Sequence, residues 1–203
     1  MNVFYKFKNL KLRYKQKFHR PFLFQTERAS NMVFNHPLKT FKQFILKVLI
    51  GLTYRCQCKC IYCGCGKYPL LKENELTNKE ILEVIKQIAD IPTISTVISF
   101  FGGEALLRDD IYEFINFANK KGLFTELESN GLLLNLENVK KLKTLGLHHS
   151  FIRIESSKPE IHDALSNYKG CFKKAIEGVE MLQAKFSLLQ FSTPSIAFLK
   201  QPL

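Results

Sequence analysis

Long apolar segments are missing from this sequence of 203 residues. The longest apolar run, from Phe44 to Leu52, has nine residues and is interrupted by Lys47. Roughly 20 apolar residues are needed to cross a bilayer, so the sequence predicts no membrane-spanning helix. The N-terminus carries charges every two or three residues and lacks the apolar core of a secretory signal. The sequence therefore predicts a cytoplasmic protein.

Acidic residues are nearly absent from the first 48 residues. This segment has eleven lysines and arginines and a single acid, Glu27, which gives it a charge of +10, whereas residues 49–203 carry only +2. Apolar residues from Val3 to Phe18 recur every three or four positions, so we expect residues 1–45 to form a basic arm that is partly helical. Such an arm offers phosphate contacts, but the nearly neutral remainder argues against an extended nucleic-acid surface.

Cysteine is confined to one short segment and one distant position. Five of the six cysteines fall within ten residues, and the sixth is Cys171. A disulfide framework would distribute its cysteines along the chain in order to join distant segments. The concentration of thiols instead indicates metal ligands in a reducing compartment.

Three of the clustered cysteines, Cys56, Cys60 and Cys63, have the spacing C-x3-C-x2-C. Three thiolates on one loop can hold a [4Fe–4S] cluster and leave its fourth iron open, which marks a reactive site. A structural zinc site is the alternative, but it needs four ligands, and no second C-x2-C pair follows. The spacing favours iron–sulfur over zinc and leaves zinc open.

Strands are predicted to alternate with helices from about residue 46 onward. Hydrophobic patterns predict strands at 47–53, 95–101, 123–128 and 150–155, with 186–191 as a candidate fifth. Helices are expected after the capping box of Thr77 and Glu80, after Asp110, after Asn135 and after Cys171. This alternation predicts βαβ units around a parallel sheet, and ligands of such sheets bind beyond the carboxyl ends of the strands.

Short polar motifs follow three of the predicted strands. The second strand is followed by Gly102-Gly103-Glu104, the third by Ser129-Asn130-Gly131 and the fourth by Glu155-Ser156-Ser157. Paired glycines let a ligand approach the backbone closely, and a carboxylate beside them can bind an ammonium group. Each motif alone is typical of an ordinary turn or a solvated loop.

Taken together, the motifs resemble those of the radical S-adenosylmethionine (SAM) superfamily. The three spaced cysteines match its CxxxCxΦC motif, with Tyr62 as the aromatic residue. Residues 102–107 resemble its GGEPLL motif, with Ala105 in place of proline, and residues 129–131 resemble its TNG turn. The resemblance covers about residues 46–185 and is closest in style to members that modify ribosomally made peptides.

The resemblance implies an α/β fold, an incomplete parallel (βα) barrel. Residues 46–189 would supply about four to five of its six βα units, followed by an irregular tail at 190–203. It also implies that Cys56, Cys60 and Cys63 hold a [4Fe–4S] cluster and that SAM chelates its fourth iron. Cleavage of SAM would give a 5′-deoxyadenosyl radical, which abstracts hydrogen from a peptide or small-molecule substrate. An electron donor such as a flavodoxin or ferredoxin is the implied partner.

For SAM itself, the resemblance implies contacts at the strand ends. The residues that match the family's SAM-binding positions are Gly102, Gly103, Glu104, Asn130, Glu155 and Ser156. Glu104 is expected to accept a hydrogen bond from the SAM amino group, and Glu155 or Ser156 is expected to contact its ribose. Cys58 and Cys65 fall outside the cysteine motif and are expected to be thiols that bind no metal.

Two departures from the family and the small number of βα units leave other hypotheses open. Arg153 stands where the family often has serine, and Ser166 lies near a position that commonly holds arginine. The chain is therefore also compatible with a truncated, non-catalytic paralogue that binds a cluster, or with an enzyme whose barrel a partner chain completes. A zinc-binding protein associated with nucleic acid is a further hypothesis, although nucleic acid is the less expected partner.

Overall fold

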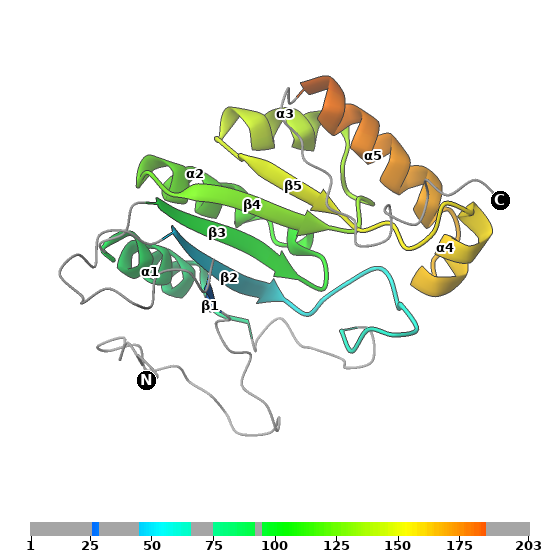
Figure 1. Cartoon of the computed structure of the whole chain (residues 1–203), viewed down its shortest axis with the longest axis horizontal. Coiled ribbons are helices and arrows are strands. Elements are labelled where there is room, and N and C mark those ends of the chain that lie inside the picture. Colours follow the sequence, from blue (N-terminus) through cyan, green and yellow to red (C-terminus); the bar gives the residue numbers. More distant parts are fainter. Residues whose placement is uncertain (1–25, 29–44, 66–74, 92–94, 186–203) are drawn as a thin grey trace, which may run out of the picture.

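The computed structural model describes residues 26–28, 45–65, 75–91 and 95–185 (Figure 1). In these residues five strands form one sheet in chain order. They are β1 (Thr26–Arg28), β2 (Ile45–Thr53), β3 (Ser95–Gly102), β4 (Phe124–Ser129) and β5 (His149–Ile152). The strands β2 to β5 are parallel, and each pairs with the next one along the chain, as the predicted alternation requires.

The short strand β1 lies inside the segment that the sequence predicts to be a basic arm. Its residues pair antiparallel with Leu46 to Val48 of β2 and so add an edge strand to the parallel sheet. The helix predicted near residues 3–18, the candidate strand 186–191 and the tail 190–203 lie outside the described residues.

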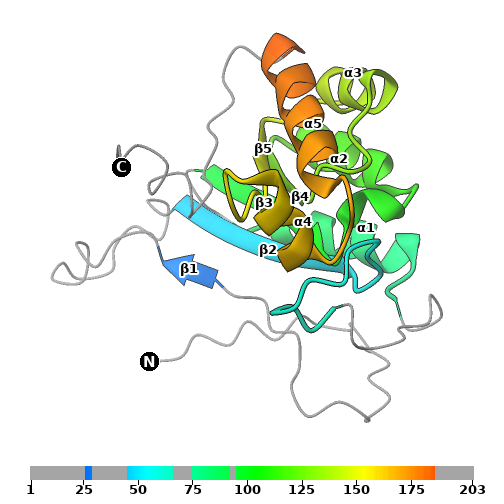
Figure 2. The same cartoon turned by 90° about the vertical axis from the view of Figure 1, so that its right-hand side faces the viewer.

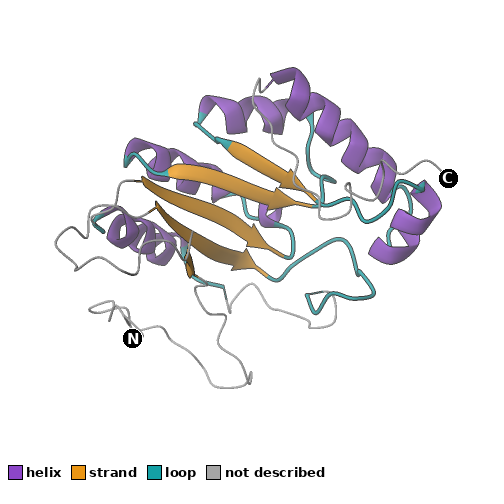
Figure 3. Ribbon diagram, in the orientation of Figure 1, coloured by secondary structure: helices purple, strands orange, loops and turns teal. Residues whose placement is uncertain are grey.

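Helices cover one face of the sheet, as the view onto the carboxyl ends of the parallel strands shows (Figure 2). These helices are α1 (Asn78–Ala89), α2 (Ile111–Lys120), α3 (Leu136–Thr144) and α5 (Cys171–Lys185). A further helix, α4 (Pro159–Ser166), lies beyond the carboxyl ends of the strands (Figure 3). In the described ranges, no helix has the length and apolar character needed to cross a membrane.

The core lies between the sheet and this helical layer because alternate strand residues and one stripe of each helix are apolar. Ile98 and Phe100 of β3 are completely buried, and the Phe100 ring lies 6.4 Å from the ring of Phe114 in α2. The helix expected after the Thr77–Glu80 capping box is present as α1, and it turns an apolar stripe toward this core. The stripe consists of Ile81, Val84, Ile85 and Ile88, all of them buried.

Two local expectations differ from the structure. The fourth predicted strand, 150–155, is instead the four-residue β5, because its partner β4 ends where Ser129 pairs with Ile152. The helix α4 was not predicted. It has Pro159 in its first turn and ends at Asn167 in the left-handed conformation, but its eight residues are too short to show a clear hydrophobic period.

The capping box of α1 generates a test of the fold. The Thr77 side chain accepts a hydrogen bond from the Glu80 amide, and the Glu80 carboxylate accepts one from the Thr77 amide at 2.8 Å. Replacing Thr77 with alanine should lower the free energy of unfolding by about 1 kcal/mol, because a helix donor loses its partner. The matched control is Thr144→Ala, at an exposed position that ends α3. Urea unfolding should show a lower stability for Thr77→Ala than for Thr144→Ala. Equal stabilities would show that the cap contributes nothing.

Candidate active site at the carboxyl edge of the sheet

All of the predicted site residues lie at one edge of the sheet, where the parallel strands end (Figure 1). The cysteine loop follows β2, the Gly-Gly-Glu turn ends β3, the Ser-Asn-Gly turn ends β4, and Glu155 and Ser156 follow β5. Parallel strands bring their carboxyl ends together, so residues far apart in the sequence share this edge.

The Gly-Gly-Glu turn makes direct backbone contact with the start of the cysteine loop. The Gly103 amide donates to the carbonyl oxygen of Thr53 at 2.7 Å, and the Glu104 amide donates to that of Arg55 at 2.8 Å. A Cβ atom on Gly102 would lie 2.3 Å from the Thr53 carbonyl oxygen, and one on Gly103 would lie 2.4 Å from that of Arg55. Only glycine fits, because the two strand ends touch here. The chain itself makes a close backbone approach here, and the approach of a ligand to these glycines stays a prediction.

Glu104 is a buried carboxylate that joins two strand ends. The side chain has 0% of its surface exposed. Its Oε1 accepts hydrogen bonds from the Leu106 amide at 3.1 Å and the Ser129 hydroxyl at 2.9 Å, and its Oε2 accepts one from the Asn130 amide at 2.8 Å. Burial raises the pKa of this carboxyl, against the effect of the three donors. The contact predicted between Glu104 and SAM stays a prediction.

Asn130 connects the β4 turn to the cysteine loop. Its Oδ1 accepts a hydrogen bond from the Leu132 amide at 3.0 Å, which orients the side chain. Its Nδ2 then lies 3.6 Å from the sulfur of Cys56 and 3.6 Å from that of Cys58. The structure therefore brings the predicted SAM-site residue Asn130 next to a predicted cluster ligand. Hydrogen bonds to sulfur are one means by which proteins tune the potential of a bound cluster.

The five cysteines of the loop differ in exposure and acidity. The predicted ligands Cys56, Cys60 and Cys63 are partly exposed, whereas Cys58 has only 2% of its surface exposed. A hydrogen bond with Cys58 is the main cause that lowers the pKa of Cys60 to about 6, and burial raises the pKa of Cys65 to about 12. These shifts favour the thiolate, the form that binds iron, at Cys60 and the protonated thiol at Cys65.

The donor set fits a [4Fe–4S] cluster. Three partly exposed thiols stand on one loop, and a cluster binds each thiolate through a different iron atom. In the described parts of the chain, no three His, Cys, Asp or Glu side chains converge closely enough to hold a single metal ion. A cluster does not require such convergence, because its own iron and sulfide atoms span the distance between the thiolates.

The residues that follow β5 contact the cysteine loop and α4. The Tyr62 hydroxyl, from the aromatic position of the cysteine motif, donates to Oε1 of Glu155 at 2.6 Å. Arg153, which stands at a departure from the family, lies 3.5 Å from the same carboxylate. The Ser156 hydroxyl accepts a hydrogen bond from the Lys158 amide at 3.1 Å and so precedes the first turn of α4. Both candidates for the ribose contact thus have partners within the chain.

An ion pair beside the cysteine loop was not predicted from the sequence. Arg55, directly before Cys56, donates to Glu75 at 2.7 Å, and Glu75 also accepts a hydrogen bond from Thr53. These bonds hold the end of β2 to the segment that leads into α1. In the sequence, only the position of Arg55 directly before the cysteine motif hinted at this ion pair. Its partner Glu75 lies 20 residues away, and no nearby motif identifies it.

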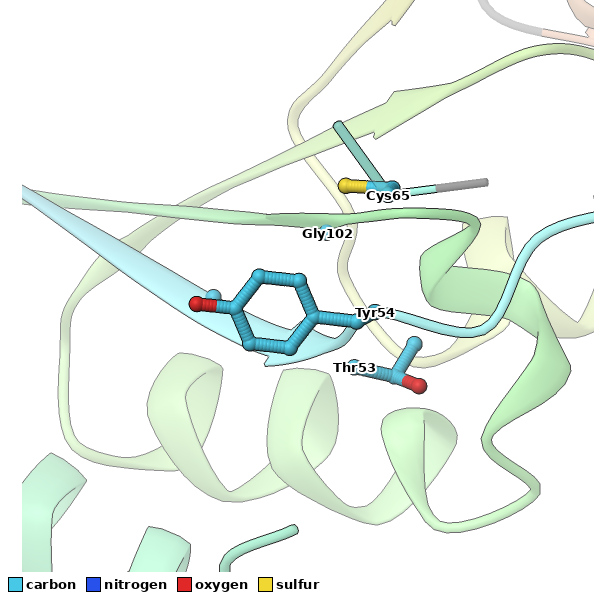
Figure 4. Close-up of a pocket in the computed structure, with 5 residues that line it drawn as sticks. Thr53, Tyr54, Cys65 and Gly102 are labelled. Atoms are coloured by element: carbon cyan, nitrogen blue, oxygen red, sulfur yellow. The ribbon is translucent and has the colours of Figure 1, made fainter. Parts of the chain in front are cut away.

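A small hollow lies beside the end of β2 (Figure 4). It has a volume of about 50 Å³, and Gly51, Thr53, Tyr54, Cys65 and Gly102 line it. Pockets that enclose drug-sized ligands have volumes of roughly 300–1,000 Å³. The hollow is therefore too small to enclose a molecule of the size of SAM.

A family model and two curated proteins match this chain. The family model described as the radical SAM superfamily matches residues 50–193. A curated relative, Fe-coproporphyrin III synthase of Methanosarcina barkeri, is 32% identical over 156 residues, which are 77% of this chain and 38% of the relative. PqqA peptide cyclase of Bradyrhizobium diazoefficiens is 30% identical over 132 residues, or 65% of this chain and 34% of the relative. The chain thus spans between a third and two fifths of these relatives.

A solved structure supports the fold. The enzyme anSMEcpe with bound AdoMet and a peptide has a TM-score of 0.57 and 16% identity, and the match covers 70% of this chain and 40% of that chain. At this identity the likeness concerns the fold, which confirms the predicted partial (βα) barrel.

The backbone contact at Gly103 yields a second test. An alanine Cβ at this position would meet the backbone oxygens of Tyr54 and Arg55 at 2.5 and 2.4 Å, and no rotation of a side chain can relieve that contact. Gly103→Ala should lower the free energy of unfolding by about 1–3 kcal/mol, as overpacking does, and should reduce the iron bound after anaerobic reconstitution.

The control for this variant is Gly122→Ala. Its Cβ would meet nothing within 4 Å, although Gly122 has a φ of +76°. Strain of about 1–2 kcal/mol is expected there, with unchanged iron content, because Gly122 lies before β4 at the opposite edge of the sheet. If Gly103→Ala takes up iron as well as Gly122→Ala does, the contact does not shape the cysteine loop.

Proposed function

Because this chain belongs to the radical SAM superfamily, we propose that it is a radical SAM enzyme that holds a [4Fe–4S] cluster through Cys56, Cys60 and Cys63. With SAM bound, such a cluster supplies the electron that cleaves SAM to a 5′-deoxyadenosyl radical, which abstracts a hydrogen atom from the substrate. The observation that carries the proposal is the set of three partly exposed thiols on one loop, placed against the turns that end β3 and β4.

The loop places its ligands by anchors on both sides. At its start, the carbonyl oxygen of Arg55 accepts the Glu104 amide hydrogen bond, so Cys56 leaves the sheet at a fixed point. Further along, the Lys59 and Ile61 amides donate to carbonyl oxygens at the end of α4 at 3.1 and 3.0 Å. These anchors hold the segment that carries Cys60 before any metal is bound.

We propose the strand-end residues as the SAM site. The backbone of Gly102 and Gly103 would lie beside the methionine end of SAM, with Asn130 next to it. Oε2 of Glu104 accepts one hydrogen bond in the described residues and keeps a lone pair for the SAM amino group. The carboxylate is fully buried, however, so the surrounding turns would have to move apart for this contact. Glu155 and Ser156 are the proposed ribose contacts. The bond from Tyr62 to Glu155 would then orient this carboxylate.

A ribosomally made peptide is the proposed substrate. The relative named PqqA peptide cyclase and the fold neighbour with a bound peptide support this class. A porphyrin is the second candidate, because the relative named Fe-coproporphyrin III synthase is 32% identical over 156 residues. A flavodoxin or ferredoxin is the proposed electron donor.

A reducing compartment suits the thiols, and we propose the cytoplasm. The six cysteines are all free thiols, a state that reducing compartments preserve. We propose a catalytic radical SAM enzyme. No observation on the described residues favours the non-catalytic paralogue or the zinc-binding protein. The chain spans at most two fifths of the length of these two relatives. Its catalytic activity, alone or with a completing partner chain, is therefore part of the proposal.

The test of this function is anaerobic reconstitution with iron and sulfide, followed by reduction in the presence of SAM. The chain should bind about four irons and four sulfides and release 5′-deoxyadenosine. Cys60→Ala should lose cluster uptake and SAM cleavage, because one iron loses its thiolate. Cys58→Ala should keep cluster uptake, because this buried thiol lies outside the ligand set.

Each alternative predicts a different outcome. Zinc bound in place of iron would contradict the cluster. A cluster that forms without release of 5′-deoxyadenosine would indicate the non-catalytic paralogue. Equal loss of iron in Cys58→Ala and Cys60→Ala would show that the ligand assignment is wrong.

A further inference from the structure

A pair of thiols joins the cysteine loop to α5, and neither member is a proposed cluster ligand. The sulfur atoms of Cys58 and Cys171 are 3.8 Å apart, although the two residues are 113 positions apart in the sequence. Both side chains are buried, with 2% and 1% of their surface exposed, and both are free thiols. The proposed mechanism uses neither residue.

The fold fixes both members of this pair. The amide of Lys59, next to Cys58, donates to the carbonyl oxygen of Ser166 at the end of α4. Cys171 begins α5, and the carboxylate of Asp163 accepts hydrogen bonds from the neighbouring Gly170 and Phe172 amides at 2.5 and 2.9 Å. The two sulfurs therefore meet because backbone and capping bonds position both segments.

The imidazole ring of His162 lies beside the thiol of Cys171. Its Nδ1 accepts a hydrogen bond from the Glu155 amide at 3.1 Å, and an amide can only donate, so this nitrogen carries no proton. The ring proton therefore sits on Nε2, which lies 3.4 Å from the sulfur of Cys171. A donor aimed at a sulfur stabilises the thiolate, the form that attacks an oxidised sulfur.

We propose that Cys58 and Cys171 form a reversible disulfide when the protein is oxidised. The bond ties the centre of the cysteine loop to the start of α5 and leaves Cys56, Cys60 and Cys63 as thiols. The sulfurs need to approach by about 2 Å to reach the S–S bond length. This inference concerns the metal-free chain and does not rest on the proposed function.

The chemistry balances with a peroxide as the oxidant. One thiol is oxidised to a sulfenic acid while the peroxide is reduced, and one water leaves. The second thiolate then attacks the sulfenic sulfur, the S–S bond forms and a second water leaves. The two sulfurs lose two electrons and two protons in total, and a dithiol reductant restores both thiols by exchange.

The test uses the metal-free full chain, reduced and purified without oxygen. A limiting amount of hydrogen peroxide is added, the remaining thiols are alkylated after unfolding, and digestion with mass spectrometry maps the linkages. The first disulfide should join Cys58 to Cys171, with a mass loss of two hydrogen atoms and with the other four cysteines alkylated. Treatment with dithiothreitol should reverse it.

Variants separate this linkage from general oxidation. Cys58→Ser and Cys171→Ser should each lose it, and the matched control Cys65→Ser should keep it. A first disulfide between two cysteines of the loop would overturn the proposal. Alkylation of both Cys58 and Cys171 after the other four cysteines have been oxidised would also overturn it. The map of the unmodified chain decides the question even if a serine variant fails to fold.

Discussion

The backbone contact between the end of β2 and the Gly-Gly turn of β3 is the constraint on which the rest of the site depends. Neither glycine has room for a Cβ atom, so the cysteine loop must leave the sheet directly beside Glu104. The buried carboxylate of Glu104 then bonds Ser129 and the Asn130 amide, and the Asn130 side chain returns to Cys56. Three strand ends are thus joined before any cofactor is present.

The sequence predicts the local features of this arrangement and misses its long-range pairs. Hydrophobic periods identify the parallel strands and the stripe of α1, because burial of one face imposes those periods. Nothing near Glu104 indicates that its carboxylate is enclosed by donors from two strand ends. Likewise, the pairing of Cys58 with Cys171 depends on how α4 docks, and that short helix has no clear sequence signature. Motif spacing locates the site, whereas packing decides which side chains remain accessible.

The cysteines illustrate how packing divides residues of one kind. Cys56, Cys60 and Cys63 are partly exposed at the sheet edge, where iron can reach them. Cys58, between two of these residues in the sequence, points into the protein instead and meets a thiol from α5. The docking of α4 and α5 produces this division, because the Lys59 amide donates to the end of α4 and the Cys58 sulfur lies 3.8 Å from that of Cys171 at the start of α5. The same loop can therefore present metal ligands on one side and a thiol pair on the other.

In the proposed enzyme, three cysteines would hold a cluster and leave one iron open to SAM. The most direct measurement is electron paramagnetic resonance of the reconstituted, reduced chain, recorded before and after SAM is added. We expect the signal of a reduced [4Fe–4S] cluster whose g values shift when SAM is added, because SAM would become a ligand of the open iron. A cluster signal that SAM leaves unchanged, or no cluster signal at all, would contradict the claim.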